Sequence, residues 1–292
     1  MPGSRVPQNR GMSQHLTTGS TTNVSPAHDR LLVGFDGSQG SVAAVDWAAA
    51  EATARGASLL VVMGRALPEA VDFSGIGARQ IADLEELAQH IAVEHPTLDL
   101  DIAATVLDPR DALIREASEA DLLVLGSTER GAAHRLLFGS VAHSAARRSP
   151  CPLVVVRGRR STAAIHTIAV GADGSSASDA ALLWAAAEAE LHVAEIIVVH
   201  GWDRSGVRAD ATAILDDAVT RCSARCSRPV RGDLFDGDAA TALTAWTIEA
   251  DLLAIGSRGR SGFRTALFGS VALAVAEHAM CPVVITHPRP RA

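Results

Sequence analysis

The chain carries the same long pattern twice, and this repeat restricts the folds open to it. The stretch LLVGFDGSQGSVAAVDWAAAEA from Leu31 matches IAVGADGSSASDAALLWAAAEA from Ile168, at an offset of 137 residues. Further along, GSTERGAAHRLLFGSVA from Gly126 matches GSRGRSGFRTALFGSVA from Gly256, at an offset of 130. The second copy has therefore lost seven residues, which we place between its second strand and its third helix. A repeat of this length predicts two copies of one domain.

Each copy alternates short apolar runs with longer segments of helical periodicity, which is typical of an α/β fold with a parallel sheet covered by helices on both faces. The helical periodicity places Trp47 and Trp184 on the buried side of their helices. In the second copy we predict strands at 167–172, 195–200, 229–233, 252–255 and 282–286. The sequence therefore predicts two tandem doubly wound domains.

The last apolar run of each copy, CPLVVV or CPVVIT, has a proline at its start, where the missing backbone donor costs least. Such a strand suits the edge of a sheet. Two such edges can pair with each other and so remove an exposed ladder of backbone groups. We therefore expect the two domains to pair through these edges, either within one chain or between the chains of a homodimer.

Length and composition set further limits. With 292 residues and 48% hydrophobic composition, the chain can bury a core in each domain. We expect a disordered tail over 1–28, a first domain over 29–158 and a second over 166–288. No apolar run approaches the ~18 residues that span a bilayer, and the N-terminus lacks the apolar core of a signal peptide. We therefore expect a cytoplasmic protein without a membrane partner, and the net charge of −7 argues against a nucleic-acid partner.

The chain contains no lysine, since its 26 basic residues counted as Lys plus Arg are all arginine. A Walker A loop, a protein kinase and Schiff-base chemistry each need a lysine, so these three classes are excluded. The sequence also lacks the paired-histidine and SGGxDS motifs of nucleotidyl-transfer enzymes and the G-x-S-x-G elbow of hydrolases. His200 has no evident Ser or Asp partner, and we predict no catalytic residues.

The four cysteines are too few for a disulfide scaffold in a chain of this length. Cys151 and Cys281 each precede a proline and an apolar strand, so we expect buried thiols. Cys222 and Cys226 lie one helical turn apart and could chelate a metal ion, but no His or carboxylate cluster completes that site in the sequence. We therefore predict no metal site.

Two motifs in each copy fall where a doubly wound sheet binds ligands, beyond the carboxyl ends of its strands. In the second copy Asp173 follows the first strand, and Gly256 and Gly259 follow the fourth. Gly269 and Ser270 then open a helix. Glycines let backbone N–H groups approach phosphate oxygens, and a helix N-terminus adds N–H groups and partial positive charge, with Ser270 placed to cap or to donate.

Arginines add positive charge to this loop, at Arg258, Arg260 and Arg264. Together these features predict a polyphosphate cradle that needs no lysine. The alternative interpretation is that a glycine-rich loop is simply a common connection after a strand and that Ser270 only caps a helix. Repetition of the pattern at matched positions in both copies favours binding.

With these motifs the chain resembles the universal stress proteins, specifically the tandem type of their ATP-binding branch, from residue 30 to residue 287. The resemblance implies a five-stranded parallel sheet in the order 3-2-1-4-5 in each domain. It implies ATP as the ligand, with or without Mg²⁺, and a non-catalytic stress-response or signalling role in which the nucleotide alters shape or partners.

The resemblance also implies roles for particular residues. Asp173 would meet the adenine or ribose end, and the backbone near Gly201 would line the base pocket. The ribose and phosphates would be held by Gly256, Gly259, Gly269, Ser270 and Val271. The first copy matches at Asp36, Gly64, Gly126, Gly139, Ser140 and Val141.

Glu129 departs from the pattern, because it stands where the second copy has Gly259. It places a Cβ atom and a carboxylate where the family has bare backbone beside phosphates. Repulsion between unit charges ~4 Å apart is on the order of 1 to 4 kcal/mol. We therefore expect the first site to be the weaker, unless Glu129 swings outward or binds phosphate through Mg²⁺.

Two other classes of function stay open at this point. The first is a slow ATPase or a nucleotidyl-transfer enzyme of a related fold. The second is an interaction module that binds no nucleotide. Saturable ATP binding without turnover would separate our hypothesis from both.

Overall fold

We describe the fold from a computed structural model, which covers residues 29–64, 73–105, 107–129, 136–137, 139–157, 164–204, 206–259 and 269–288. The side chains of 73–81, 128–129 and 136–137 lie outside this description. In these ranges no helix is both long enough and apolar enough to cross a membrane.

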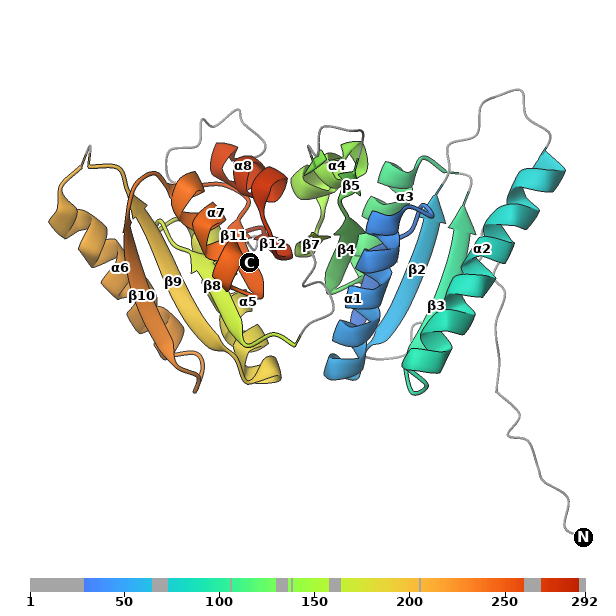
Figure 1. The fold of residues 1–292 in the computed structure, drawn as a ribbon, viewed down its shortest axis with the longest axis horizontal. Coiled ribbons are helices and arrows are strands. Elements are labelled where there is room, and N and C mark those ends of the chain that lie inside the picture. The colour runs from blue at the N-terminus through green and yellow to red at the C-terminus, as the bar shows by residue number, and fades with distance from the viewer. Residues whose placement is uncertain are drawn as a thin grey trace, which may run out of the picture.

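The first copy follows an alternation of strand and helix along the chain (Figure 1). Its main elements are β1 (Arg30–Gly34), α1 (Gln39–Arg55), β2 (Ser58–Gly64), α2 (Phe73–Glu94), β3 (Asp99–Thr105), α3 (Pro109–Glu116), β4 (Leu122–Gly126), α4 (Ser140–Arg148) and β7 (Leu153–Val156). A 3₁₀ turn at Ala117–Glu119 precedes β4. The short strands β5 (Thr128–Glu129) and β6 (Leu136–Leu137) pair separately after β4.

The second copy repeats this order. Its elements are β8 (Thr167–Gly171), α5 (Ser176–His192), β9 (Glu195–Trp202), α6 (Arg208–Ser223), β10 (Val230–Asp236), α7 (Ala239–Glu249), β11 (Leu252–Gly256), α8 (Ser270–His278) and β12 (Val283–Thr286). All five predicted strands are confirmed, with small differences at their ends. Helix α6 has 16 residues where α2 has 22, so most of the lost residues come from this helix.

The strands form one sheet in the order β10-β9-β8-β11-β12-β7-β4-β1-β2-β3. Each half therefore has the predicted order 3-2-1-4-5, and all pairs within a half are parallel. At the centre β12 pairs antiparallel with β7, with Val284 opposite Val154 (Figure 1). The two proline-led edges thus pair within the chain, and a homodimer would need another surface.

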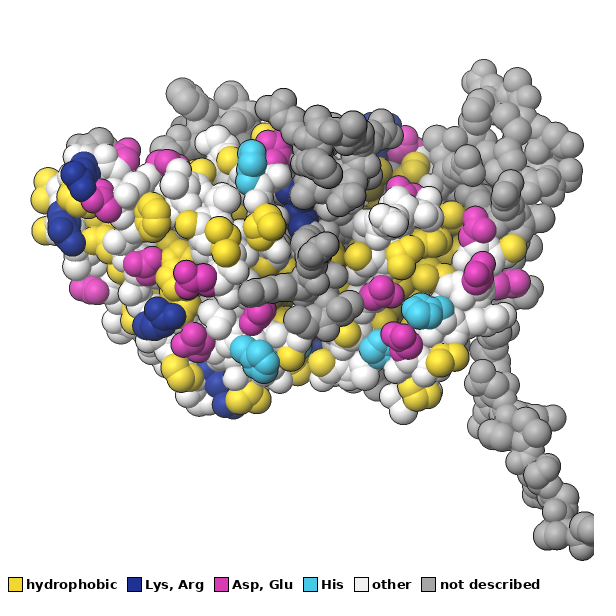
Figure 2. Space-filling model, in the orientation of Figure 1, with side chains coloured by type: hydrophobic (Ala, Val, Ile, Leu, Met, Phe, Trp, Pro, Cys, Tyr) yellow, Lys and Arg dark blue, Asp and Glu magenta, His cyan; other side chains and the backbone are white. Residues whose placement is uncertain are grey.

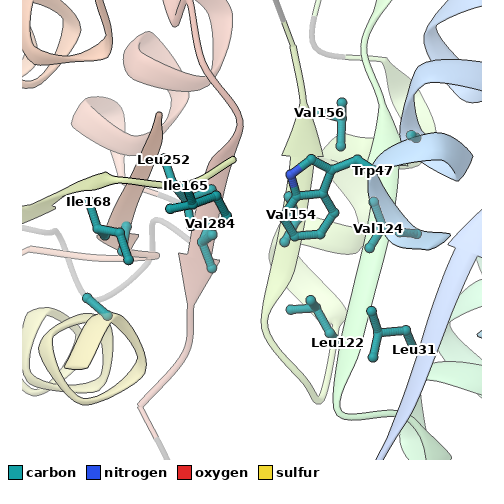
Figure 3. Close-up of a cluster of buried hydrophobic side chains, with 14 of the residues drawn as sticks. Leu31, Trp47, Leu122, Val124, Val154, Val156, Ile165, Ile168, Leu252 and Val284 are labelled. Carbon is teal, nitrogen blue, oxygen red and sulfur yellow. The ribbon is translucent and has the colours of Figure 1, made fainter. Parts of the chain in front are cut away.

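Helices cover both faces of the sheet because alternate strand residues point to opposite sides. Leu31 and Val33 of β1 face the layer of α1, α2, α5 and α6, whereas Leu32 faces the layer of α3, α4, α7 and α8. Trp47 is buried in the core between the sheet and the layer of α1, α2, α5 and α6, and Figure 3 shows it beside Val154. Trp184 packs against the same core but stays partly exposed, so its prediction as a buried residue is only partly confirmed.

The helices that follow the first strand of each copy begin in the same way and end differently. Ser38 caps α1 by accepting a hydrogen bond from the Ser41 N–H, and Ser175 caps α5 by accepting one from the Ser178 N–H. The C-cap of α1 is Gly56, in the left-handed region with φ of 65°. The C-cap of α5 is Val193 with φ of 58°, a conformation that a β-branched residue rarely adopts.

The charged side chains on the face shown in Figure 2 are mixed in sign. Basic side chains lie over the left half and the centre of the described part of this face, whereas acidic and hydrophobic ones are spread over both halves. A general nucleic-acid binder would need a continuous basic surface along the phosphate backbone.

Candidate functional site

The predicted site residues lie where parallel strands end, at one edge of each half-sheet. Asp173 comes two residues after β8, and Gly256 is the last residue of the neighbouring strand β11. In the first copy Asp36 comes two residues after β1, and Gly126 ends the neighbouring β4. These strand pairs form the switch point of each half-sheet, where connections leave on opposite faces.

A network of short polar contacts orients the aspartate in both copies. The Asp173 Oδ1 atom accepts a hydrogen bond of 2.9 Å from the Ser175 N–H, and the Asp173 N–H donates to Ser178 Oγ at 3.4 Å. The matching contacts of Asp36 are with the Ser38 N–H at 3.0 Å and Ser41 Oγ at 3.3 Å. Each aspartate is therefore held by the N-terminal turn of the helix that follows it.

The electrostatics of this turn favour an ionised carboxylate. Partial burial would raise the pKa of Asp36, but hydrogen bonds from Ser38 and Ser41 outweigh it, and the pKa lies below its ordinary value. An ionised carboxylate accepts hydrogen bonds and cannot donate them. Chemically, the group suits a ligand hydroxyl or amino group and repels a phosphate.

The glycine loop of the second copy lies against Asp173. A Cβ atom built on Gly259 would be 2.7 Å from Asp173 Oδ2, so the bare backbone permits this approach. Ser175 Oγ donates to the Arg258 carbonyl at 3.4 Å. The structure thus brings the loop after β11 and the turn after β8 together.

The N-terminus of α8 closes the same site. Gly269 N–H donates to the Ser257 carbonyl at 2.9 Å, and a Cβ atom on Gly269 would be 3.9 Å from the Gly259 nitrogen. The first backbone hydrogen bond of the helix runs from the Leu273 N–H to the Gly269 carbonyl at 3.1 Å. The N–H groups of 270–272 are therefore not used by the helix ladder.

The cap of α8 differs from the prediction for Ser270. Gly269 occupies the N-cap position, Ser270 is the first helical residue, and no side chain makes a capping hydrogen bond. Helix α4 begins in the same way, with Gly139 as N-cap and Ser140 and Val141 in the first turn. A hydroxyl at the first helical position does not cap its own helix, so the prediction that Ser270 caps α8 was wrong. The prediction that Ser270 donates to a ligand stays a prediction.

Four of the predicted glycines lie at close backbone contacts. A Cβ atom on Gly256 would be 2.6 Å from the Ala177 carbonyl carbon, and one on Gly126 would be 2.0 Å from the Gly40 oxygen. At these two positions the fourth strand of each copy ends against the first turn of the helix that follows the first strand, which is α5 or α1. Gly64 and Gly201 would meet the Cα atoms of Pro109 and Ala239 at 2.8 and 2.7 Å. Packing alone accounts for a glycine at these four positions.

Part of the predicted phosphate loop lies outside the described residues. This holds for Arg260 and Arg264. The backbone of Glu129 is described, and it pairs with Leu136 between β5 and β6. Its side chain is not, so the direction of its carboxylate stays a prediction.

The structure adds His287, which the sequence analysis missed. It follows β12, whose Thr286 carbonyl accepts from the Ser257 N–H at 2.8 Å. Burial, and secondly the nearby charge of Arg258, lower the pKa of His287, and its Nε2 atom is buried without a hydrogen-bond partner among the described residues. The repeat offers one signal: the matching residue of the first copy is Arg157, also polar and directly after the last strand.

His200 and the cysteines contact groups of the protein itself. His200 Nδ1 lies 2.6 Å from the Ala172 carbonyl. Cys151 and Cys281 are buried, as predicted, and burial raises the pKa of the Cys151 thiol. Burial, with Cys226 nearby, raises the pKa of Cys222 to about 12. Within the described ranges no third ligand joins these two cysteines in a metal-binding group.

Comparison with known proteins identifies the family. The universal stress protein family matches residues 28–157 and 164–287. Universal stress protein Rv2005c of Mycobacterium tuberculosis is 30% identical over 292 residues, covering 87% of this chain and 96% of that protein. A universal stress protein of Mycolicibacterium smegmatis is 30% identical over 287 residues, covering 89% and 97%.

A solved structure shares the fold over both copies. The crystal structure of a universal stress protein from Archaeoglobus fulgidus aligns with a TM-score of 0.71 and 20% identity, over 89% of this chain and 98% of that one. Sequence and fold agree on the same assignment. The chain belongs to the universal stress protein family and carries two domains of that family in tandem.

Proposed function

We propose that this protein binds ATP without catalytic turnover and acts in a stress response or in signalling, where its nucleotide state alters its shape or its partners. One observation carries the proposal. In the second copy the Asp173 carboxylate, the Gly259 backbone and the uncapped N-terminus of α8 lie together at the switch point of the half-sheet. The first copy has the same two elements, an aspartate held by Ser38 and a helix that begins at Gly139 without a side-chain cap.

The parts of ATP match these groups by charge. The N–H groups of Ser270 and Val271, with the positive end of the helix dipole, suit the phosphates. The Asp173 carboxylate suits a ribose hydroxyl or the adenine amino group, and repulsion keeps it from the phosphates. The Gly201 backbone would then line the base pocket. Arg258 or a Mg²⁺ ion held by the phosphates would supply the charge that lysine supplies elsewhere.

Slow hydrolysis is the second candidate, and His287 is the observation that favours it. A neutral imidazole beside the phosphate loop has the form of a general base. Against this role, its Nε2 atom is buried away from solvent and so from an attacking water. We therefore favour binding without turnover.

The test starts with the intact purified chain. Denaturing it and identifying any released nucleotide by mass spectrometry should yield ATP, and calorimetry on the stripped protein should show saturable ATP binding. Sustained hydrolysis above the rate in buffer alone would support the slow ATPase instead, and a rate above about one event per second would place the protein in the range of dedicated enzymes. Absence of saturable binding would leave the interaction module.

We also propose that the domains extend over 29–158 and 166–288 and that the protein works in the cytoplasm. Limited proteolysis should then cut first before residue 29 or between 158 and 166. Cutting first inside a domain would contradict these boundaries.

A further inference from the structure

A buried group of four charged residues joins the two domains, away from the nucleotide site. Glu51 and Arg55 come from α1, and Glu188 and His192 occupy the matching positions of α5. The side chains of both glutamates are only 2% exposed, whereas those of Arg55 and His192 are 21% and 16% exposed. Two carboxylates buried side by side need positive charge close to them.

The contacts divide the oxygens of these carboxylates into two sets. Arg55 donates from Nε to Glu51 Oε1 at 2.5 Å and from Nη2 to Glu188 Oε2. On the other side His192 Nε2 lies 3.0 Å from Glu51 Oε2 and 3.4 Å from Glu188 Oε1. Each carboxylate therefore gives one oxygen to Arg55 and turns the other toward His192.

One of these oxygens lacks a hydrogen bond. Glu188 Oε1 is fully buried and has no hydrogen-bond partner among the described residues, although it faces the imidazole. An unsatisfied oxygen of this kind is costly to bury. A cation beside this oxygen would satisfy it, which agrees with the grouping of the residues.

The geometry points to a binding site for a divalent transition-metal ion of the Zn²⁺ class, with Glu51 Oε2, Glu188 Oε1 and His192 Nε2 as ligands. The three atoms lie within 4.8 Å of one another. Bonds of ~2.0–2.1 Å in a tetrahedral site place neighbouring ligands roughly 3.3–3.4 Å apart. The Nε2-to-oxygen separations of 3.0 and 3.4 Å need only small movements to meet this spacing.

The surroundings suit such an ion. Arg55 binds the outer oxygens of both carboxylates and so orients them, as second-shell residues do at metal sites. Arg55 and His192 are the last residues of α1 and α5, where the helix dipoles contribute negative potential. One nitrogen and two carboxylate oxygens favour Zn²⁺ or Co²⁺ over Mg²⁺ or Ca²⁺ and leave a fourth position for water.

The site would join the two domains, because Glu51 comes from the first copy and the other two ligands from the second. In the metal-free chain His192 takes the place of the ion. There the Nε2 atom of His192 faces one oxygen of each carboxylate, at 3.0 and 3.4 Å. Binding of the ion requires Nε2 without a proton.

The experiment uses Co²⁺ as a spectroscopic probe on the full chain, stripped with EDTA and free of nucleotide. We expect visible absorption that saturates at one equivalent of Co²⁺ and disappears when Zn²⁺ is added. His192→Ala should weaken binding at least ~100-fold, since a direct ligand exceeds the 10–100-fold of second-shell changes. His166→Ala removes an exposed histidine whose backbone, rather than its ring, makes its hydrogen bonds to Asp251 and Glu195, and this variant should bind the metal as the wild type does.

A wild-type chain that shows no saturable Co²⁺ or Zn²⁺ binding would overturn the proposal, as would unchanged binding in folded His192→Ala. If circular dichroism shows that His192→Ala does not fold, Glu51→Gln is the second variant, because it keeps the shape of the side chain and removes its charge. It should also lose metal binding. Arg55→Lys keeps the positive charge but removes the paired donors that orient the two carboxylates, so we expect about 10–100-fold weaker binding. Gly269→Asp should leave metal binding intact, which separates this site from the nucleotide site.

Discussion

Substitutions at Gly259 offer the sharpest test of the nucleotide site. The pair to compare is Gly259→Ala and Gly259→Glu, where the second reproduces the residue that the first copy has at Glu129. A Cβ atom at position 259 would be 2.7 Å from Asp173 Oδ2, closer than ordinary van der Waals contact begins. The carboxylate must therefore move before any side chain fits.

The free-energy cost of moving the Asp173 carboxylate follows from the hydrogen bond that holds it. Moving Asp173 stretches its 2.9 Å hydrogen bond from the Ser175 N–H, and such a bond to a charged group is worth about 1.5–3 kcal/mol. Part of this hydrogen-bond energy would be lost whenever Asp173 leaves the position from which it contacts the ligand. We therefore expect Gly259→Ala to weaken ATP binding about tenfold. The glutamate adds repulsion on the order of 1 to 4 kcal/mol, so Gly259→Glu should weaken binding by a further factor of ~5 to several hundred.

Titration calorimetry of the intact chain measures both sites at once. The wild type should show one strong ATP site and one that is weak or absent, and Glu129→Gly should strengthen the latter. Gly206→Ala is the matched control, because a Cβ atom there meets nothing within 4 Å, and it should change neither site. Two equal sites in the wild type, together with no effect of Glu129→Gly, would refute our account of the asymmetry. Unchanged affinity in folded Gly259→Ala would show that Asp173 does not contact the ligand.

The structure supports three further predictions. Gly269→Asp should abolish ATP binding at the second site with little change in the melting temperature, because it adds a negative charge at the N-terminus of α8; unchanged affinity would mean that the phosphates lie elsewhere. Val193→Gly should stabilise the chain by about 1 kcal/mol in urea unfolding, since it relieves a left-handed valine that is 67% exposed, while Gly56→Ala should destabilise it by a similar amount. In metal-free protein Arg55→Ala should lower the free energy of unfolding by about 3–5 kcal/mol, because it removes the guanidinium that contacts two buried carboxylates, whereas Arg115→Ala, at a side chain that is 67% exposed, should change it by no more than about 0.5 kcal/mol.

The architecture could be predicted because it depends on patterns that are local in sequence. Apolar runs mark the strands, and the repeat fixes the number of domains. The strand order came from the family resemblance. The edge pairing followed from the prolines before Leu153 and Val283, and the pairing of β7 with β12 confirms it. The placement of Asp36 and Asp173 then follows, since the carboxyl ends of parallel strands share one edge of the sheet.

The glycines show where prediction from sequence stops. Gly256 and Gly259 belong to one motif, but Gly256 packs against Ala177 of α5 while Gly259 faces the Asp173 carboxylate. This difference depends on distances between segments about 80 residues apart, which no local pattern reports. A glycine that two copies share can therefore reflect backbone packing, ligand binding or both.

The charged group between the domains escaped prediction for a related reason. Glu51 and Glu188 sit in WAAAEA, which is identical in both copies, and a glutamate in a helix ordinarily faces solvent. Their burial results from the contact of α1 with α5, which exists only once β7 and β12 have paired. The identity of the two stretches was the available signal that both glutamates serve the same contact.

Joining two domains in one chain permits differences that two identical chains could not have. Two copies of one chain would place equal residues at matching positions, either two arginines or two histidines beside the buried glutamates. Here Arg55 and His192 differ, so one guanidinium orients both carboxylates and one imidazole faces their other oxygens. Arg157 extends the same principle, because its Nη1 donates to the Ala276 carbonyl of the second domain, while its counterpart His287 lies beside Arg258. The difference between Gly259 and Glu129 fits this pattern, because in a fused chain one of the two proposed nucleotide sites can weaken while the other is kept.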